Sequence, residues 1–156
     1  MIILRKDLLH EISNLAYVIA DVSEGREAPH TLHQTFDICE EGNIARVDSL
    51  LALAAAEAAA AVSPLARLIT RKGNYHLIIK PQPRDMAEPP KYVAEKTARL
   101  IREYMVATVL SGWLSVTLPS AAPFWTDRKE ETAAALQTAV DTATCRAAFT
   151  RAVPPM

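Results

Sequence analysis

The chain has 156 residues, of which 17 are Lys or Arg and 18 are Asp or Glu, so that its formal net charge is -1. A chain of this length forms one domain of ordinary size and buries roughly 70% of the surface that its unfolded form exposes. The near balance of charges supplies no long-range field that would concentrate nucleic acid or anionic lipid. We therefore expect neither a nucleic-acid partner nor a membrane partner.

Cysteine usage and the N-terminal composition bear on the cellular compartment. Cys39 and Cys145 lie far apart in the sequence and are better interpreted as free thiols than as a disulfide framework. His10 and Glu11 interrupt the apolar start of the chain, so that no secretion signal is visible. We expect a reducing setting, in the cytoplasm or within a virion.

Three helices are expected in the first half of the chain. Apolar residues recur at helical spacing over 6–22, and a shorter helix is expected over 30–40, after Pro29. Asn43 is a good N-cap for a third helix over 44–62, which contains a run of alanines. Alanine combines high helix propensity with little bulk, so the third helix should pack closely against another helix.

The sequence pattern changes to that of a β-hairpin over 67–80. Residues of high β propensity become dense on both sides of Arg71–Asn74, which supplies the turn. A lone hairpin is marginally stable in water, so it must pack on the helices or pair with another strand, which a second subunit could supply. We therefore predict that Tyr75 and Ile78 contribute to an interface.

Two long helices are expected in the second half of the chain, over 90–118 and 121–146. The run from Tyr104 to Trp125 holds no charged residue, which indicates burial, and Pro119 and Pro123 divide it into a helix end and a helix start. Its length approaches that of a membrane span, but the prolines argue against a span. We expect a buried corner between two helices.

His30, His33 and Asp37 have the one spacing that could bind a metal ion. On a helix over 30–40 these side chains would share a face. A His-x-x-His spacing also arises often by chance. A helical-bundle metal protein or enzyme is therefore kept as an alternative.

No other signature of catalysis stands out in the sequence. No local motif places a nucleophile beside a base, and the four glycines are isolated from one another, which excludes a glycine-rich phosphate loop. We expect a non-enzymatic protein that uses no cofactor.

Trp113, Phe124 and Trp125 gather around the proline corner. Packing in the core is one interpretation of these aromatic side chains. The other interpretation is an interface, because tryptophans are over-represented among the residues that anchor protein contacts. We carry all three as predicted interface residues, either for a homo-oligomer or for a small adaptor that binds another protein.

The segments IREYMV (101–106) and WLSVTLPSAAPFW (113–125) resemble the C-terminal half of small uncharacterised proteins encoded among prophage morphogenesis genes. The likeness rests on a sequence pattern of Trp-Leu, then Pro, then Ala-Pro followed by an aromatic residue. This pattern is not a catalytic motif. It implies a role in virion assembly, as a connector or tail-completion component, with oligomerisation through helices and an exposed strand.

These observations predict a mostly helical α+β domain over 1–156, with about five helices in a bundle and one small β-hairpin. The leading functional hypothesis is a structural or assembly protein that self-associates. The metal protein and the adaptor are the alternatives.

Overall fold

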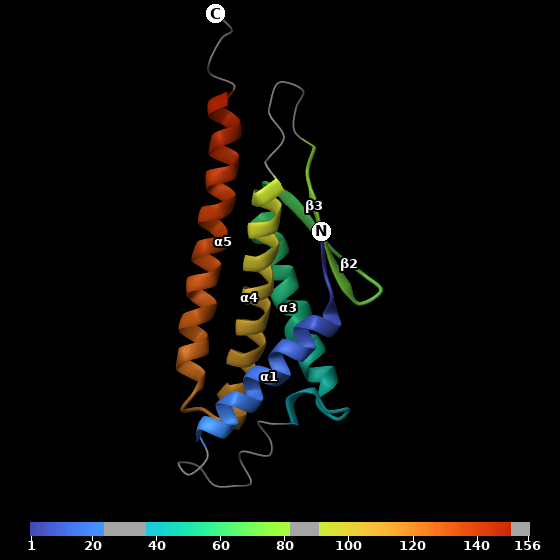
Figure 1. Cartoon of the computed structure of the whole chain (residues 1–156), viewed down its shortest axis with the longest axis vertical. Coiled ribbons are helices and arrows are strands. Elements are labelled where there is room, and N and C mark those ends of the chain that lie inside the picture. The colour runs from blue at the N-terminus through green and yellow to red at the C-terminus, as the bar shows by residue number, and fades with distance from the viewer. Residues whose placement is uncertain (24–36, 82–90, 151–156) are drawn as a thin grey trace, which may run out of the picture.

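The computed structural model describes residues 1–23, 37–81 and 91–150 (Figure 1). These ranges contain four α-helices and a three-stranded antiparallel sheet, which confirms the mostly helical α+β class. The elements are β1 (Ile2–Ile3), α1 (Arg5–Ser23), the short 3₁₀-helix η1 (Asp37–Cys39), α3 (Ile44–Val62), β2 (Ala66–Arg71), β3 (Asn74–Ile79), α4 (Lys91–Thr117) and α5 (Ala122–Thr150). Most of the helix expected over 30–40 lies outside the described residues, and its last part forms η1.

Helix α4 forms the centre of the molecule. It lies between α5 and α3, and α1 crosses the group toward its lower end (Figure 1). All seven side chains from Tyr104 to Leu110 are buried, so neighbouring elements cover every side of the helix there. The first part of the uncharged run thus lies inside the protein's own core, whereas Val116 and Phe124 farther along it are exposed. Among the described helices, none is long and apolar enough to cross a membrane.

Helices α3 and α4 approach each other closely, in agreement with the alanine-rich sequence of α3. Ala54, Ala55 and Ala58 are buried on this helix. Leu50, in the first half of α3, lies against Gly112 of α4. A Cβ atom added at Gly112 would be only 3.0 Å from Cδ2 of Leu50. Small residues on both helices therefore allow the close contact.

The proline corner joins α4 to α5. Helix α4 ends at Thr117, and the amide of Ala121 donates a hydrogen bond to the carbonyl of Leu118 across the turn. Pro123 lies in the first turn of α5, where a missing N–H costs no helical hydrogen bond. Helix α5 then runs antiparallel to α4 and buries Leu136 and Val140 against the core.

The sheet has the strand order β1-β3-β2, with β3 in the centre. β2 and β3 form the predicted hairpin, and its turn residues Lys72 and Gly73 have φ values of 47° and 76°. Two positive φ values in a two-residue loop are typical of the type I′ turn that matches the twist of the strands. The third strand, β1, pairs Ile2 with His76 and Ile3 with Tyr75, a pairing that the sequence analysis did not anticipate.

Candidate interaction surface

The predicted metal ligands are only partly described. Asp37 lies in η1 with a half-exposed side chain, whereas His30 and His33 lie outside the described residues. Within residues 1–23, 37–81 and 91–150, no group of three or more His, Cys, Asp or Glu side chains is placed to hold a metal ion. Cys39 and Cys145 are free thiols.

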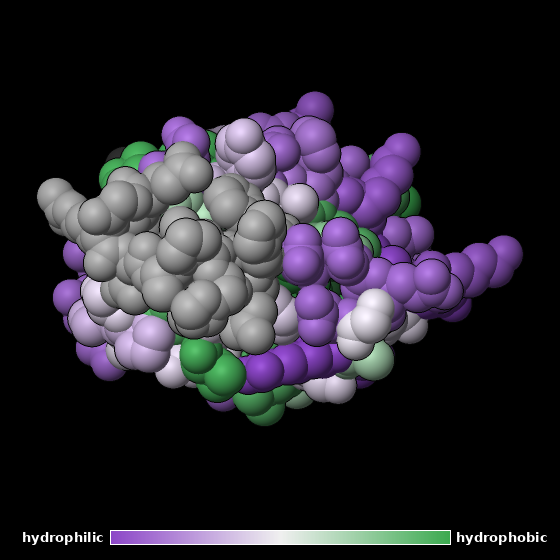
Figure 2. Space-filling model, turned by 90° about the horizontal axis from the view of Figure 1, so that it is seen from below, coloured by the Kyte–Doolittle hydropathy of each residue, from purple (hydrophilic) through white to green (hydrophobic). Residues whose placement is uncertain are grey.

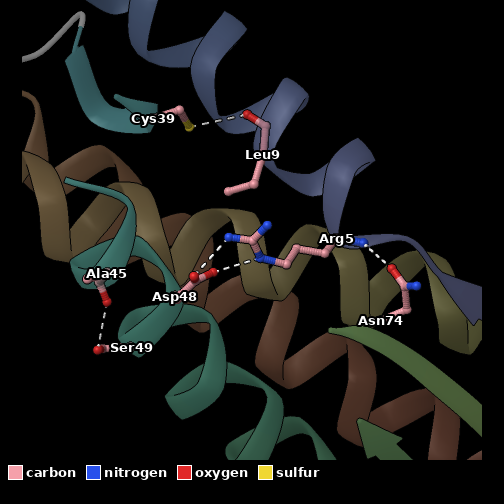
Figure 3. A network of polar contacts seen from close by, with 7 residues as sticks. All are labelled: Arg5, Leu9, Cys39, Ala45, Asp48, Ser49 and Asn74. Atoms are coloured by element: carbon pink, nitrogen blue, oxygen red, sulfur yellow. Dashed lines mark hydrogen bonds and ion pairs between the residues drawn. The ribbon is translucent and has the colours of Figure 1, made fainter. Parts of the chain in front are cut away.

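Arg5, the first residue of α1, connects this helix to α3 and to the hairpin (Figure 3). Its Nε and Nη2 atoms each donate to a carboxylate oxygen of Asp48 on α3, both at 2.8 Å. Its backbone N–H donates to Oδ1 of Asn74 in the hairpin at 3.0 Å. The hydrogen bond with Asp48 raises the pKa of the guanidinium. This bidentate contact fixes α1 relative to α3 and the sheet.

Cys39 belongs to the same region (Figure 3). Its thiol donates to the carbonyl of Leu9 at 3.5 Å, and burial raises the pKa of the thiol. A raised pKa keeps the sulfur protonated, and a thiol is a weaker nucleophile than a thiolate. We therefore assign Cys39 a structural role in holding η1 against α1.

A second polar cluster joins the three long helices. The Tyr104 hydroxyl on α4 donates to the Glu57 carboxylate on α3. Lys129 of α5 lies 3.5 Å from the same carboxylate, and its Nζ is 5.8 Å from the centroid of the Tyr104 ring. Burial, followed by the hydrogen bond to Glu57, raises the pKa of Tyr104 to about 12. The neutral phenol is therefore the form that the fold stabilises.

Alkaline pH should weaken the fold through Tyr104. Since its pKa is about 12 in the folded protein and about 10 in an unfolded chain, its contribution is present below pH 10 and is lost as the pH rises toward 12. We expect a loss on the order of 2 kcal/mol over this window. Denaturant unfolding at stepped pH should show a smaller loss for Tyr104→Phe, and an equal loss in both proteins would contradict the assignment.

The structure divides the five predicted interface residues into two groups. Trp113 and Tyr75 are 3% and 5% exposed and lie within the protein's own core. For Trp113 this position agrees with core packing, which is the alternative to an interface. Their side chains are closed to a partner in this conformation. Phe124 and Ile78 are 66% and 49% exposed, and Trp125 is partly buried.

The proline corner therefore exposes only part of its aromatic set. The rings of Phe124 and Trp125 meet edge to face, with centroids 5.3 Å apart, and Val116 is exposed nearby in sequence on the last turn of α4. On the part of this end that is not drawn in grey, small green apolar groups lie among larger purple, hydrophilic areas (Figure 2).

A more regular apolar surface lies on the side of the sheet that faces away from the helices. Because side chains alternate along a strand, Tyr75 and Leu77 enter the core while His76 and Ile78 face outward. The register places Ile2 and Ile69 on either side of His76. We call Ile2, Ile69, His76 and Ile78 the outer face, which is bordered by the exposed Arg67 and Arg71.

Sequence reasoning missed Ile2 and Ile69 of the outer face. It also grouped Tyr75 with Ile78, although two strand positions that differ by an odd number lie on opposite sides of a sheet. That alternation was the available signal for separating the two residues. Ile2 gave no signal, because its strand exists only through pairing with a distant part of the chain.

The backbone hydrogen bonds of the sheet also show which groups of β2 point away from β3. Leu77 of β3 exchanges both backbone hydrogen bonds with Met1, so its N–H and C=O point toward β1. The direction in which the backbone N–H and C=O groups point alternates from one residue to the next along an antiparallel strand. The groups of His76, and those of Asn74 and Ile78 two positions away on either side, therefore point toward β2. Within β2, Ala66, Leu68 and Thr70 then point away from β3, and no strand lies beyond them in the described part of the chain. Ala66 is only 1% exposed, so its backbone groups are covered, whereas Leu68 is partly exposed and Thr70 is exposed. We call Leu68 and Thr70 the open edge.

No protein-family model, curated protein or solved structure matches this chain. The outer face and the open edge are therefore interpreted from their geometry. Backbone N–H and C=O groups that point away from a sheet edge, beside exposed isoleucines, can bind an extended strand of another chain.

Proposed function

We propose that this protein is a non-enzymatic structural protein that assembles with further copies of itself, and that the open edge is the place where copies meet. The observation that carries this proposal is the set of backbone groups that point away from β3 at Leu68 and Thr70, which are not buried. Unpaired backbone groups at a sheet edge are a template for strand addition.

β2 lacks two of the features that commonly block strand addition. Proline, bulges and charged side chains at the edge prevent such pairing in many proteins. β2 contains no proline, and its register with β3 is continuous from Ala66 to Arg71 without a bulge. The open-edge residues Leu68 and Thr70 are uncharged, and the two charged residues of β2, Arg67 and Arg71, lie on its outer side. A strand of six residues also has the usual length for stable pairing.

The outer face would add apolar burial to this pairing. Ile2 and Ile78 expose 56% and 49% of their surface although they belong to a sheet whose opposite side is buried. Extending the sheet beyond β2 would cover part of Ile69 as well. Backbone hydrogen bonds and apolar contacts would then act together, as in other interfaces formed by strand addition.

The resemblance of 101–125 to prophage morphogenesis proteins is the reason for proposing a virion connector or tail-completion structure as the final assembly. This segment forms the end of α4 and the proline corner. The exposed side chains of Val116 and Phe124 at this corner offer a second contact, for a different protein of the same assembly.

Replacement of Thr70 by Pro should dissociate the assembly while leaving the fold intact. Proline removes an N–H that points away from β3, so the hairpin loses no hydrogen bond, but the ring obstructs an approaching strand. Light scattering after size-exclusion chromatography, across a concentration series, should give a multiple of 17.1 kDa for wild type and a monomer for the variant.

Thr70→Val is the matched control, since it keeps the N–H and the β propensity and should still associate. Unchanged far-ultraviolet circular dichroism in both variants would establish that the fold is retained. A wild-type protein that stays monomeric at every concentration would refute the proposed self-association.

A further inference from the structure

We propose that the outer face of the sheet binds an acidic amphipathic helix of another protein. This inference goes beyond the proposed self-association, which uses the backbone groups at the edge of β2. It assigns a partner of a different kind to the side of the three strands that faces away from the helices.

The outer face is apolar at its centre and is largely uncovered. Ile2 and Ile78 are 56% and 49% exposed, and Ile69 beside them is partly exposed. On the other side of the same strands, Ile3 and Leu77 are 7% and 2% exposed and belong to the core. Isoleucines that stand together in solvent on an ordered sheet are typical of a surface that contacts another molecule.

The sheet itself carries only positively charged side chains. Its strands and hairpin turn contain the exposed Arg67, Arg71 and Lys72 and no Asp or Glu. None of these three cations forms an ion pair with a described residue, whereas six cations of the described helices pair with carboxylates. Since the whole chain has a net charge of -1, the rest of the chain is net acidic. The sheet is thus the surface that complements an acidic partner.

A helix fits this face better than an extended strand. The backbone N–H and C=O groups of a strand laid over the face would lie against the isoleucines without hydrogen-bond partners. A helix satisfies its backbone groups internally and makes contact through side chains alone. Three strands spaced about 4.8 Å apart are roughly 10 Å wide, which matches the diameter of one helix.

The two arginines of β2 set the spacing that we expect in the partner. Arg67 and Arg71 lie at either end of the face on β2, roughly 13 Å apart along the strand, with Ile69 between them. On a helix aligned with β2, residues seven or eight positions apart are separated by about 11–12 Å. The partner helix should therefore carry an apolar stripe over the isoleucines and two carboxylates about two turns apart on the side of β2.

The outer face lacks the features that nucleic acids and membranes require. Unpaired bases stack on exposed aromatic rings, but Tyr75, which is the one Tyr, Phe or Trp of the three strands, lies on the buried side. An anionic membrane is wider than the sheet and would also face the acidic remainder of the chain. A single acidic helix matches both the charge and the size of the face.

Selection from a peptide library tests the chemistry of the partner directly. The full chain, immobilised through its C-terminus, is exposed to alanine-based helical peptides in which the positions of one face are randomised. We expect enriched peptides to carry an apolar stripe bordered by Asp or Glu seven or eight positions apart. Enrichment of basic or uncharged peptides, or no enrichment over the bare support, would overturn the inference.

Charge reversal on both partners tests the assigned contacts. Arg67→Glu/Arg71→Glu should raise the dissociation constant of an enriched peptide by about tenfold or more. A peptide with Lys in place of its two carboxylates should prefer this variant over wild type by a similar factor. Lys91→Glu/Lys96→Glu is the matched control, because it changes the net charge equally at exposed positions of α4, and it should alter binding by less than about twofold.

Isothermal titration calorimetry measures these constants, and circular dichroism shows that each variant is folded. If the original peptide bound Arg67→Glu/Arg71→Glu as tightly as wild type, the helix would bind elsewhere and the inference would be wrong. Vesicles of phosphatidylserine and phosphatidylcholine, and single-stranded poly(U), are titrated in parallel. Tighter binding of either one, lost in the double variant, would assign the face to lipid or nucleic acid instead.

Thr70→Pro separates this inference from the proposed self-association. The variant blocks the open edge and should still bind the enriched peptide, since the outer face contributes side chains and no backbone groups. Loss of peptide binding in Thr70→Pro would indicate strand addition at the edge and would overturn the helix on the face. A wild type that stays monomeric but binds the peptide would refute self-association alone.

Discussion

Replacement of Trp113 by Ala is expected to lower the free energy of unfolding by about 3–5 kcal/mol. Trp113 is 3% exposed and lies on α4, where that helix packs against α3. The guanidinium of Arg46 lies 5.4 Å from the centroid of its ring. Truncation would leave a cavity and remove this cation–π contact. Urea unfolding followed by circular dichroism measures the change without depending on tryptophan fluorescence.

Trp113→Phe separates the two properties of the indole. The Nε1 atom of Trp113 is buried and has no hydrogen-bond partner among the described residues, which costs free energy in the wild type. Phenylalanine keeps most of the apolar volume and removes this unpaired donor, so its destabilisation should be less than half that of alanine.

Phe124→Ala is the surface control for the same experiment, because Phe124 is largely exposed. It should change stability by no more than about 0.5 kcal/mol. If Trp113→Ala cost as little as Phe124→Ala, Trp113 could not be a core residue, and its predicted role in an interface would regain support.

The second large effect is expected at Ile3, where alanine should cost about 2–5 kcal/mol. Ile3 is 7% exposed and joins the core from β1. The neighbouring Ile2 is a matched control of the same residue type on the opposite side of the same strand. Since Ile2 is 56% exposed, Ile2→Ala should change the stability of the monomer by about 0.5 kcal/mol or less.

Amide hydrogen exchange provides the second readout for β1. The amide of Leu77 donates to the carbonyl of Met1 at 2.8 Å, so it reports whether β1 is docked. Ile3→Ala should accelerate exchange at Leu77 more than at His76, which points to β2. Equal costs for Ile2→Ala and Ile3→Ala would contradict the assigned sides of the strand.

The helices and the hairpin could be predicted because their signals are local. The helix expected over 44–62 is observed as Ile44–Val62, and that expected over 90–118 as Lys91–Thr117. Alanine content and the prolines of the corner act within a few residues. The expected N-cap, Asn43, precedes α3 but makes no side-chain capping hydrogen bond, and its side-chain amide donates to the carbonyl of Asp37 instead. The turn signal Lys72-Gly73 likewise places both strands of the hairpin close to their observed bounds.

The sheet order and the candidate surface could not be predicted from local signals. β1 has two residues, too few for any periodic pattern, and is a strand only because it pairs with β3. Without β1, the free edge of the hairpin could not be assigned to β2 instead of β3. Whether Trp113 is buried likewise depends on a long-range contact, because α3 packs beside α4 around it. The residues near Trp113 in the sequence do not specify that contact.

The central position of β3 also has a consequence for synthesis on the ribosome. The amino group of Met1 bonds to a carbonyl 76 positions later, and α1 packs against α4, which is later still. The N-terminal segment must therefore emerge long before its partners exist. Helix α3 and the hairpin can form from local contacts in the meantime, whereas β1 and α1 must wait for distant partners. Apolar residues such as Leu8 and Ile12 remain exposed during this interval and are candidates for chaperone binding.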